Sequence, residues 1–281
     1  MTQALLITLR EGLEISLLIV IVLAYLKKTG RGHLFTPVWQ GTGAAVAVSV
    51  GAGALLFWLG NGLSGKTEEV FEGSAMLLAV IVLSWMVIWM KSQARGIRGN
   101  LEAKVERAIG GGSGLALATL AFLVVVREGL ETALFLFGAS DSASPAATTV
   151  GGLLGLAAAI VIGRLIYQGS RRINLALLFN VTGVLLILFA AGLLAHGLHE
   201  FQEAGYVHVF VEEVWNTNDI VDEKGTPGSL LKGLLGYNGN PSLLEVLAYP
   251  TYLVLALAFF VKPSRSAGEG RRQRGAAAPA G

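Results

Sequence analysis

The chain has 281 residues, of which 53% are hydrophobic and only 14% are charged, and its formal net charge at pH 7 is +2. A soluble domain usually carries about a quarter charged residues, so this composition excludes an ordinary soluble protein and indicates an integral membrane protein. Cysteine is absent, which excludes disulfides, iron–sulfur clusters and thiolate metal sites; a metal would have to bind through oxygen or nitrogen.

Seven apolar segments are each long enough to cross a bilayer core of about 30 Å. The first lacks the basic stretch of a cleavable signal sequence, so we interpret it as a membrane helix. The predicted spans are residues 3–26, 38–60, 70–91, 113–139, 148–167, 174–197 and 243–262. We therefore expect an all-α integral membrane protein with seven transmembrane helices, in which residues 1–262 form one membrane domain.

The connections between these spans differ in charge, and cytoplasmic loops carry an excess of lysine and arginine. Alternate connections and the C-terminal tail hold Lys27, Lys28, Arg31, Lys91, Arg95, Arg98, Lys104, Arg107, Arg164, Arg171, Arg172, Lys262, Arg265, Arg271, Arg272 and Arg274. The intervening connections hold Lys66, Lys224 and Lys232. This alternation predicts that the N-terminus lies outside and the C-terminus in the cytoplasm.

Two segments outside the spans have a distinct composition. Residues 263–281 are basic and rich in small residues, which predicts a disordered tail. Residues 198–242 are predicted to form a long acidic loop on the outer face; its acidic residues are Glu200, Glu203, Glu212, Glu213, Asp219, Asp222 and Glu223. Such a loop can gather cations, although a loop that is merely solvated would have the same composition.

The sequence Arg-Glu-Gly-Leu-Glu occurs twice, at residues 10–14 and 127–131, each time well inside a predicted span. The two spans run in opposite directions, so we expect a repeat of three plus three helices in inverted orientation, followed by a seventh helix. Transporters built in this way place their substrate site near the membrane midplane, where the repeats meet.

Each copy of the motif places two carboxylates on one helix face, because residues three apart are neighbours on a helix. The carboxylates are Glu11 and Glu14 in the first copy and Glu128 and Glu131 in the second, with Arg10 and Arg127 four residues before Glu14 and Glu131. An ionisable residue inside a membrane costs about 2.5–3.5 kcal/mol on insertion scales and has to face a partner or a water-filled path. Four carboxylates around one volume suit a hard cation with oxygen ligands, and the arginines would keep them ionised. The alternative is a buried ion-pair network that only fixes helix register.

Several polar residues near the outer helix ends are further candidates. Glu72, with Glu69 at the Glu-x-x-Glu spacing, is a candidate for the metal pathway. The alternative is a structural helix start, in which Thr67 is the cap and Glu68 and Glu69 suit the positive end of the helix. His199, Glu200 and Glu203, with His196, could form a loading site on one helix face, or simply a solvated helix end. Glu245 follows Ser242 at capping-box spacing, which favours a capping role. The tryptophans Trp39, Trp58, Trp85, Trp89 and Trp215 are predicted to anchor the helices at the membrane interfaces.

On the two Arg-Glu-Gly-Leu-Glu motifs in the first and fourth spans, the chain resembles the oxidase-dependent iron transporter family, which includes the fungal high-affinity iron permeases and the bacterial Efe-system permease. The likeness extends to EVFEG (69–73), WMVIWM (85–90), HEFQEAG (199–205) and GLLGYNGNPSLLEV (233–246), and the bacterial branch is the closer match. The resemblance implies uptake of Fe²⁺ or Fe³⁺ across the bacterial cytoplasmic membrane, with the four motif glutamates carrying the ion and no further cofactor. It also implies two periplasmic partners, one cupredoxin-like and one a haem peroxidase.

Three other functions are open at this stage. A permease of the same fold could carry another divalent metal, such as manganese or lead. An intramembrane di-metal enzyme is less well supported, because four-helix di-iron enzymes use Glu-x-x-His on two helices and both motifs here lack histidine; we therefore expect no enzymatic activity. A structural scaffold would tolerate neutral substitutions in the motifs.

Overall fold

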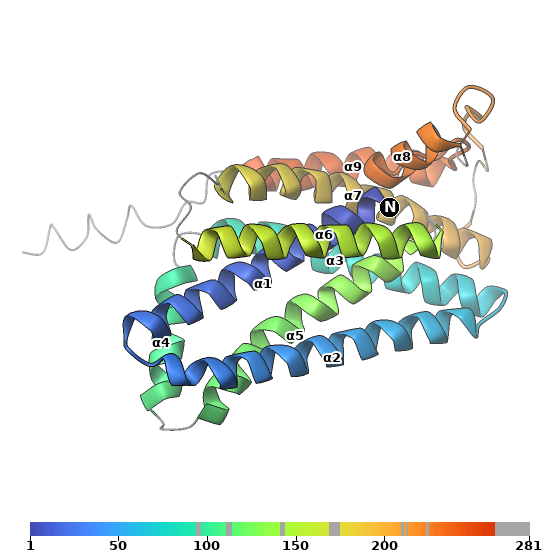
Figure 1. Ribbon diagram of the computed structural model, residues 1–281. Coiled ribbons are helices and arrows are strands. Elements are labelled where there is room, and N and C mark those ends of the chain that lie inside the picture. Colours follow the sequence, from blue (N-terminus) through green and yellow to red (C-terminus); the bar gives the residue numbers. More distant parts are fainter. Residues whose placement is uncertain are drawn as a thin grey trace, which may run out of the picture.

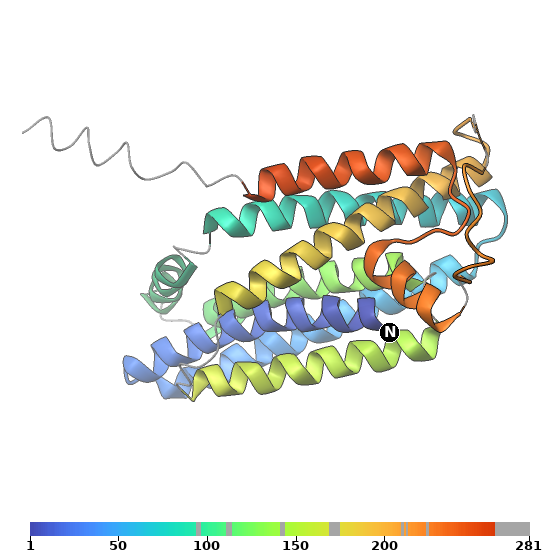
Figure 2. The same ribbon diagram turned by 90° about the horizontal axis from the view of Figure 1, so that it is seen from above.

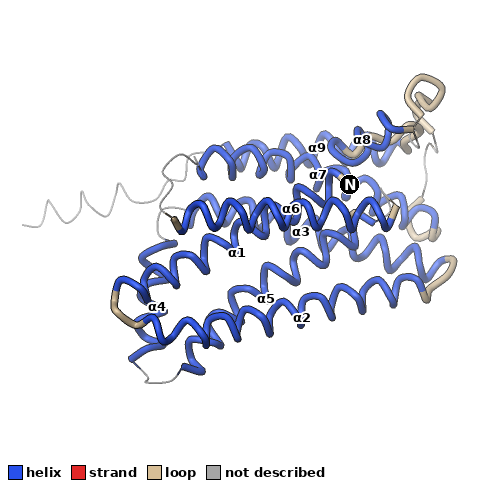
Figure 3. The backbone as a smooth tube through the Cα atoms, viewed as in Figure 1, coloured by secondary structure: helices blue, strands red, loops and turns tan. Residues whose placement is uncertain are grey.

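The computed structural model describes residues 1–93, 97–110, 114–140, 144–168, 175–208, 211, 213–222 and 225–261, and every regular element in these ranges is helical (Figures 1 and 3). The elements are α1 (Thr2–Lys28), η1 (Gly32–Leu34), α2 (Phe35–Asn61), α3 (Lys66–Gln93), α4 (Ile97–Gly110), α5 (Gly114–Gly138), α6 (Pro145–Tyr167), α7 (Leu175–Glu203), α8 (Thr226–Leu235) and α9 (Leu243–Val261). A long helix covers the position of each of the seven predicted spans. The basic tail, residues 263–281, lies outside the described residues.

Five helices of the described part contain a stretch that is long and apolar enough to cross a membrane; they are α2, α3, α6, α7 and α9. In α7, 61% of this stretch is buried inside the protein, whereas the corresponding values are 11% in the α2 segment and 6% in α9. Helix α7 therefore lies at the centre of the bundle, and α2 and α9 lie at its periphery. Helices α1 and α5 are of similar length, but their middles carry Arg10, Glu11 and Glu14 and Arg127, Glu128 and Glu131.

Two shorter helices were not predicted. Helix α4 lies in the connection between α3 and α5 and buries Leu101 and Val105, four residues apart on one face, against α1 and α5. Helix α8 lies within residues 198–242, which were expected to be a loop, and α7 extends into the same segment. Helix α8 ends at Gly236, whose backbone is left-handed (φ 67°) and lies directly against Gly192 of α7. A side chain at Gly236 would be strained by the backbone and would clash with α7.

The long helices pack in pairs. Helix α1 packs along α6, α2 along α5, and α3 along α7, while α9 covers α7 (Figures 1 and 2). The contacts of α1 with α6 and of α2 with α5 rise together in residue number, so each of these two pairs is parallel. In the third pair Gly73 lies against Phe201 and Gly197 against Leu77, so α3 and α7 are antiparallel.

Glycines make the closest contacts in the two parallel pairs. The approaches are Gly12 against Ala159 and Gly129 against Ser49; Gly151 against the carbonyl of Met1 and Gly41 against that of Ala118; and Gly163 against Ser16 and Gly53 against Ala133. A constant shift in residue number places the first Arg-Glu-Gly-Leu-Glu copy on the second, and so maps α1 onto α5. A second constant shift places Gly41 on Gly151, and so maps α2 onto α6. Together the two shifts map each of these contacts between α2 and α5 onto a contact between α1 and α6. Small residues at these sites let the helix backbones approach closely.

We expect Gly41→Val to destabilise the protein by about 1–3 kcal/mol or more, because a side chain there would overlap the Ala118 carbonyl and force α2 away from α5. Gly43→Val is the matched control: it places the same β-branched residue in the same helix, but Gly43 faces open space. The measurement is the thermal unfolding midpoint of the purified protein in detergent. Equal midpoints for the two variants would contradict the tight α2–α5 contact.

Candidate metal site at the crossing of α1 and α5

The first motif lies in the middle of α1 with its arginine fully enclosed. Only 2% of Arg10 is exposed. Its guanidinium nitrogens lie 3.0 Å from Glu11 Oε1 and 3.2 Å from Glu14 Oε1, and Nη1 also lies 3.3 Å from Met86 Sδ of α3. One arginine therefore pairs with both carboxylates of its own motif inside the bundle.

The second motif, in α5, has a more open arginine. Arg127 Nε donates a hydrogen bond of 3.0 Å to Glu131 Oε1 and lies 3.9 Å from Glu128 Oε1. Its guanidinium carbon is 5.3 Å from the ring centre of Trp85 and 4.9 Å from that of Trp89, and these rings stack on each other. A cation over aromatic rings is attracted by their negative faces. The two tryptophans, which were predicted only as interface anchors, thus cover the second arginine.

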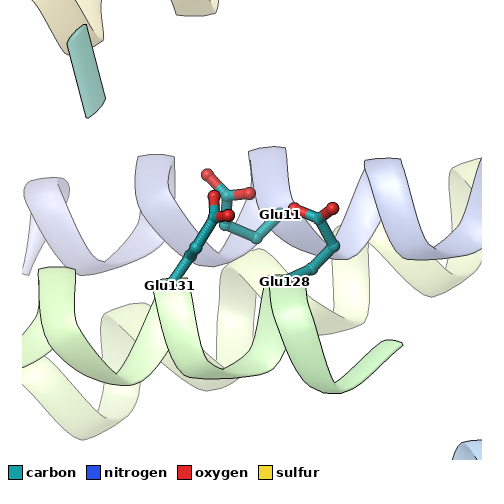
Figure 4. A group of neighbouring side chains, drawn as sticks. All are labelled: Glu11, Glu128 and Glu131. Carbon is teal, nitrogen blue, oxygen red and sulfur yellow. The ribbon is translucent and has the colours of Figure 1, made fainter. Parts of the chain in front are cut away.

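Three carboxylates from the two motifs converge where α1 and α5 meet. Figure 4 shows Glu11 of α1 facing Glu128 and Glu131 of α5, and one oxygen of each lies within 4.8 Å of the others. All three residues are buried. Glu14 is not part of this group; it lies one turn along α1, paired with Arg10. The prediction of four carboxylates in one volume is therefore met by three of them, with the fourth adjacent.

Each of the three converging carboxylates has one oxygen atom that no hydrogen bond of the described residues occupies. Among the described residues, no hydrogen bond reaches Oε2 of Glu11, Glu128 or Glu131, although all three atoms are shielded from solvent. A buried acceptor without a partner costs about 1–3 kcal/mol. A hard cation held by the three carboxylates would offset this cost, since such ions prefer carboxylate ligands. The donor set therefore fits a metal ion bound through oxygen.

A cavity of about 670 Å³ lies beside this cluster. Residues of α1, α2, α5 and α6 line it, and Glu72 of α3 contributes to its wall. Thr8 and Thr132, each within one turn of a motif glutamate, also line it. Of the outer residues predicted to act on the metal pathway, Glu72 is therefore the one that lines this cavity.

The other outer candidates lie on α7, away from this cavity. Glu200 is buried where α7 packs against Gly73 of α3, and Glu203 is exposed, with Oε1 3.3 Å from His199 Nε2. Nδ1 of His199 lies 3.0 Å from Glu245 Oε1. His199 is thus held between two carboxylates at the junction of α7 and α9.

Glu245 begins α9 as a capping residue, as predicted. Its Oε1 accepts from the Ser242 backbone N–H at 3.2 Å, and the Ser242 hydroxyl faces the Glu245 N–H at 3.4 Å. Oε2 accepts a 2.7 Å hydrogen bond from Asn238. Only 2% of Glu245 is exposed, so this cluster of polar groups ties the last helix to α7.

Comparison with known proteins gives the same assignment over almost the whole chain. Residues 1–274 match the iron permease FTR1 family. The chain belongs to this family. Relatives named ferrous iron permease EfeU include proteins from Escherichia coli strain 536 (37% identity), Shigella sonnei (36%) and Yersinia pestis (35%), each aligned over 263 residues. These alignments cover 93% of this chain and 95%, 95% and 93% of the relatives. No solved structure matches the chain.

Membership of the iron permease FTR1 family makes this chain a permease rather than an enzyme. It also agrees with the several long apolar helices of a multi-pass membrane protein. The sequence-based recognition of the family is thereby confirmed. The buried carboxylates at the crossing of α1 and α5 are then the natural place to look for the transported ion.

We expect Arg10→Met to destabilise this FTR1-family protein by about 3–5 kcal/mol, because removing one partner of a buried ion pair leaves Glu11 uncompensated. Arg127→Met should cost less, since 35% of the Arg127 side chain is exposed. The double variant Arg10→Met/Glu11→Gln should recover part of the loss by removing both charges. Thermal unfolding of the purified proteins tests this order, and a larger loss from Arg127→Met would contradict it.

Proposed function

We propose that α1, α2, α3, α5, α6, α7 and α9 all span the membrane, with α1–α3 and α5–α7 forming an inverted repeat and α9 added to it. The superimposable glycine contacts of the two parallel helix pairs support the repeat. One end of the bundle carries the basic residues Lys27, Lys28, Lys104, Arg107 and Arg164, which supports a cytoplasmic location for that end. The N-terminus then lies outside, and the protein crosses the bacterial cytoplasmic membrane.

The function that the site supports best is the movement of iron across this membrane through the two motifs. The observation that carries it is the convergence of Glu11, Glu128 and Glu131, with an unsatisfied oxygen on each, at the crossing of α1 and α5. Glu14 lies one turn further along α1, so the ion can pass to it after the cluster. Arg10 and Arg127 lie beside the empty carboxylates and limit their mutual repulsion.

The proposed ion is Fe²⁺, because the relatives are named ferrous iron permeases. Manganese is the second candidate, since it prefers carboxylate ligands, and lead is a further one. Carboxylate donors alone do not distinguish strongly among these ions. Competition between these ions for transport distinguishes the candidates.

Outside the cluster, the predicted outer residues have two different functions. Glu72 guides the ion, because it borders the cavity beside the motifs. His199, Glu200 and Glu203 collect ions only weakly, since His199 already lies between two carboxylates. The periplasmic cupredoxin-like and haem peroxidase-like partners are proposed from the sequence resemblance, and they would deliver iron at the end of the bundle where α8 lies.

We expect Glu131→Ala and Glu11→Ala to lower the accumulation of radioactive ferrous iron in cells by at least about tenfold, the usual scale for loss of a metal-site residue. Glu213→Ala is the control, because it removes the same side chain from an exposed position on the outer segment. The measurement is uptake normalised to the amount of protein in the membrane. Undiminished uptake by either motif variant would count against the site.

Ion selectivity is best measured with purified protein in liposomes. We expect ferrous iron to enter in proportion to the amount of protein, with manganese competing more strongly than zinc, because zinc prefers sites with nitrogen or sulfur ligands. A pH gradient is the second variable, since proton exchange on the carboxylates can drive release. Uptake of manganese that exceeds that of iron under equal conditions would favour the alternative permease.

A further inference from the structure

The cavity beside the metal site is lined by hydroxyl groups at the outer end of the bundle. Thr8, Thr132, Ser140 and Thr149 are among its lining residues. Each hydroxyl donates a hydrogen bond to a carbonyl of its own helix or helix end: to Ala4 at 2.7 Å, Glu128 at 2.7 Å, Phe137 at 2.5 Å and Pro145 at 2.8 Å. A hydroxyl that uses its proton in this way keeps lone pairs as acceptors. The cavity thus offers oxygen atoms suited to a cation that is losing water.

The repeat relates these positions to a different set of residues at the opposite end of the bundle. The two shifts that superimpose the glycine contacts place Thr8 on Val125, Thr132 on Ile15, Ser140 on Leu23, Thr148 on Val38 and Thr149 on Trp39. Val125, Leu23 and Val38 are buried in one apolar cluster, and Ile15 packs against it. Four of the five hydroxyl residues that line the cavity therefore have an aliphatic counterpart and the fifth has an aromatic one, so the two halves of the proposed path differ in chemistry.

Helix α4 completes the apolar half. Its buried residues Leu101 and Val105 belong to the same cluster, together with Leu117 of α5. The void that remains between α1, α4 and α5 has a volume of only about 10 Å³, whereas a single water needs about 10–15 Å³. This void is therefore too small for a hydrated ion.

We propose that the cation reaches the carboxylate cluster only through the hydroxyl-lined cavity, and that α4 with its aliphatic partners is the barrier that has to open for release on the other side. This inference rests on the proposed function for the nature of the cargo and on the proposed orientation for the side of entry. The separation of a wet half from a dry half rests on the cavity, the apolar cluster and the residue exchange between them.

The absence of cysteine from the chain allows a direct test with single cysteine variants. The variants are Thr132→Cys deep in the cavity, Thr148→Cys nearer its mouth, Leu117→Cys in the apolar cluster and Val50→Cys, a lipid-facing control that is 67% exposed on α2. Each is expressed in right-side-out and inverted membrane vesicles and treated with a cationic, membrane-impermeant thiol reagent. The rate of modification is followed by mass spectrometry.

We expect Thr148→Cys and Thr132→Cys to react from the outer face at least about tenfold faster than Leu117→Cys and Val50→Cys, because a thiol in apolar surroundings has a raised pKa and little reactive thiolate. Leu117→Cys should stay unreactive from both faces. Reaction of Thr132→Cys from the inner face alone, or equal reaction of Leu117→Cys, would overturn the proposal. So would modification of both cavity variants only by a lipid-soluble maleimide, since the cavity would then hold lipid rather than water.

A second pair of variants tests the helix that forms the barrier. In the Leu117→Cys background, Val105→Asn places an amide in the buried face of α4, and Ala103→Asn places the same group on its exposed face. We expect Val105→Asn to hydrate the barrier and raise the reaction of Leu117→Cys from the inner face at least about tenfold, with no change from Ala103→Asn. An unchanged rate in both variants would exclude α4 as the barrier.

Ferrous iron, added with a reductant during labelling, separates the failure of this inference from failure of the proposed function. Protection of Thr132→Cys by iron would support both. Side-specific labelling without any protection by iron would overturn the proposed cargo while the one-sided path stands.

Discussion

The ion pairs buried where α1 and α5 meet are the constraint on which the rest of the structure depends. Removing a carboxylate or a guanidinium from water costs several kcal/mol per ion, which is recovered only with close and well-oriented partners. Arg10 has these partners in Glu11 and Glu14, and Arg127 has them in Glu131 and two tryptophan rings. The glycine-mediated approaches between α1 and α6 and between α2 and α5 hold the two motif helices in place.

The two halves of the protein share a framework but not a chemistry. Corresponding glycines make corresponding contacts, yet Arg10 is enclosed while Arg127 is partly exposed. Hydroxyls at one end of the bundle are replaced by apolar residues at the other. A transporter has to present different surroundings to the ion on the two sides of its site at any one moment. Here positions that correspond in the two halves carry polar side chains at one end of the bundle and apolar side chains at the other.

Much of this architecture follows from hydropathy and from the repeated motif. Apolar runs located all the long helices, and the spacing of Ser242 and Glu245 predicted a cap that the structure confirms. Helices α4 and α8 were missed because both are short, and α4 buries only one face, through residues such as Leu101 and Val105. A search for runs of about 20 apolar residues does not detect them.

Contacts between residues far apart in the chain were the other limit on prediction. Spacing within α1 shows that Glu11 and Glu14 share a face, but it does not show which of them meets the pair on α5; in the structure it is Glu11. In the same way, the spacing within α7 did not show that Glu245, from the last helix, lies beside His199. The packing of Arg127 on Trp85 and Trp89 also required the position of α3.

The short length of α4 has a consequence for the proposed topology as a whole. A chain that crosses the membrane three times ends on the side opposite to its start. The next three helices then begin on that side, so they have the inverted orientation relative to the first three. This holds only if the connector returns to the bundle on the side where the first half ended. With 14 residues and one apolar face, α4 is too short to cross a bilayer core of about 30 Å. A connector that crossed the membrane would give both halves the same direction and break the relation between the two arginine motifs. The inverted orientation of the two halves therefore depends on α4, the least hydrophobic helix of the described residues.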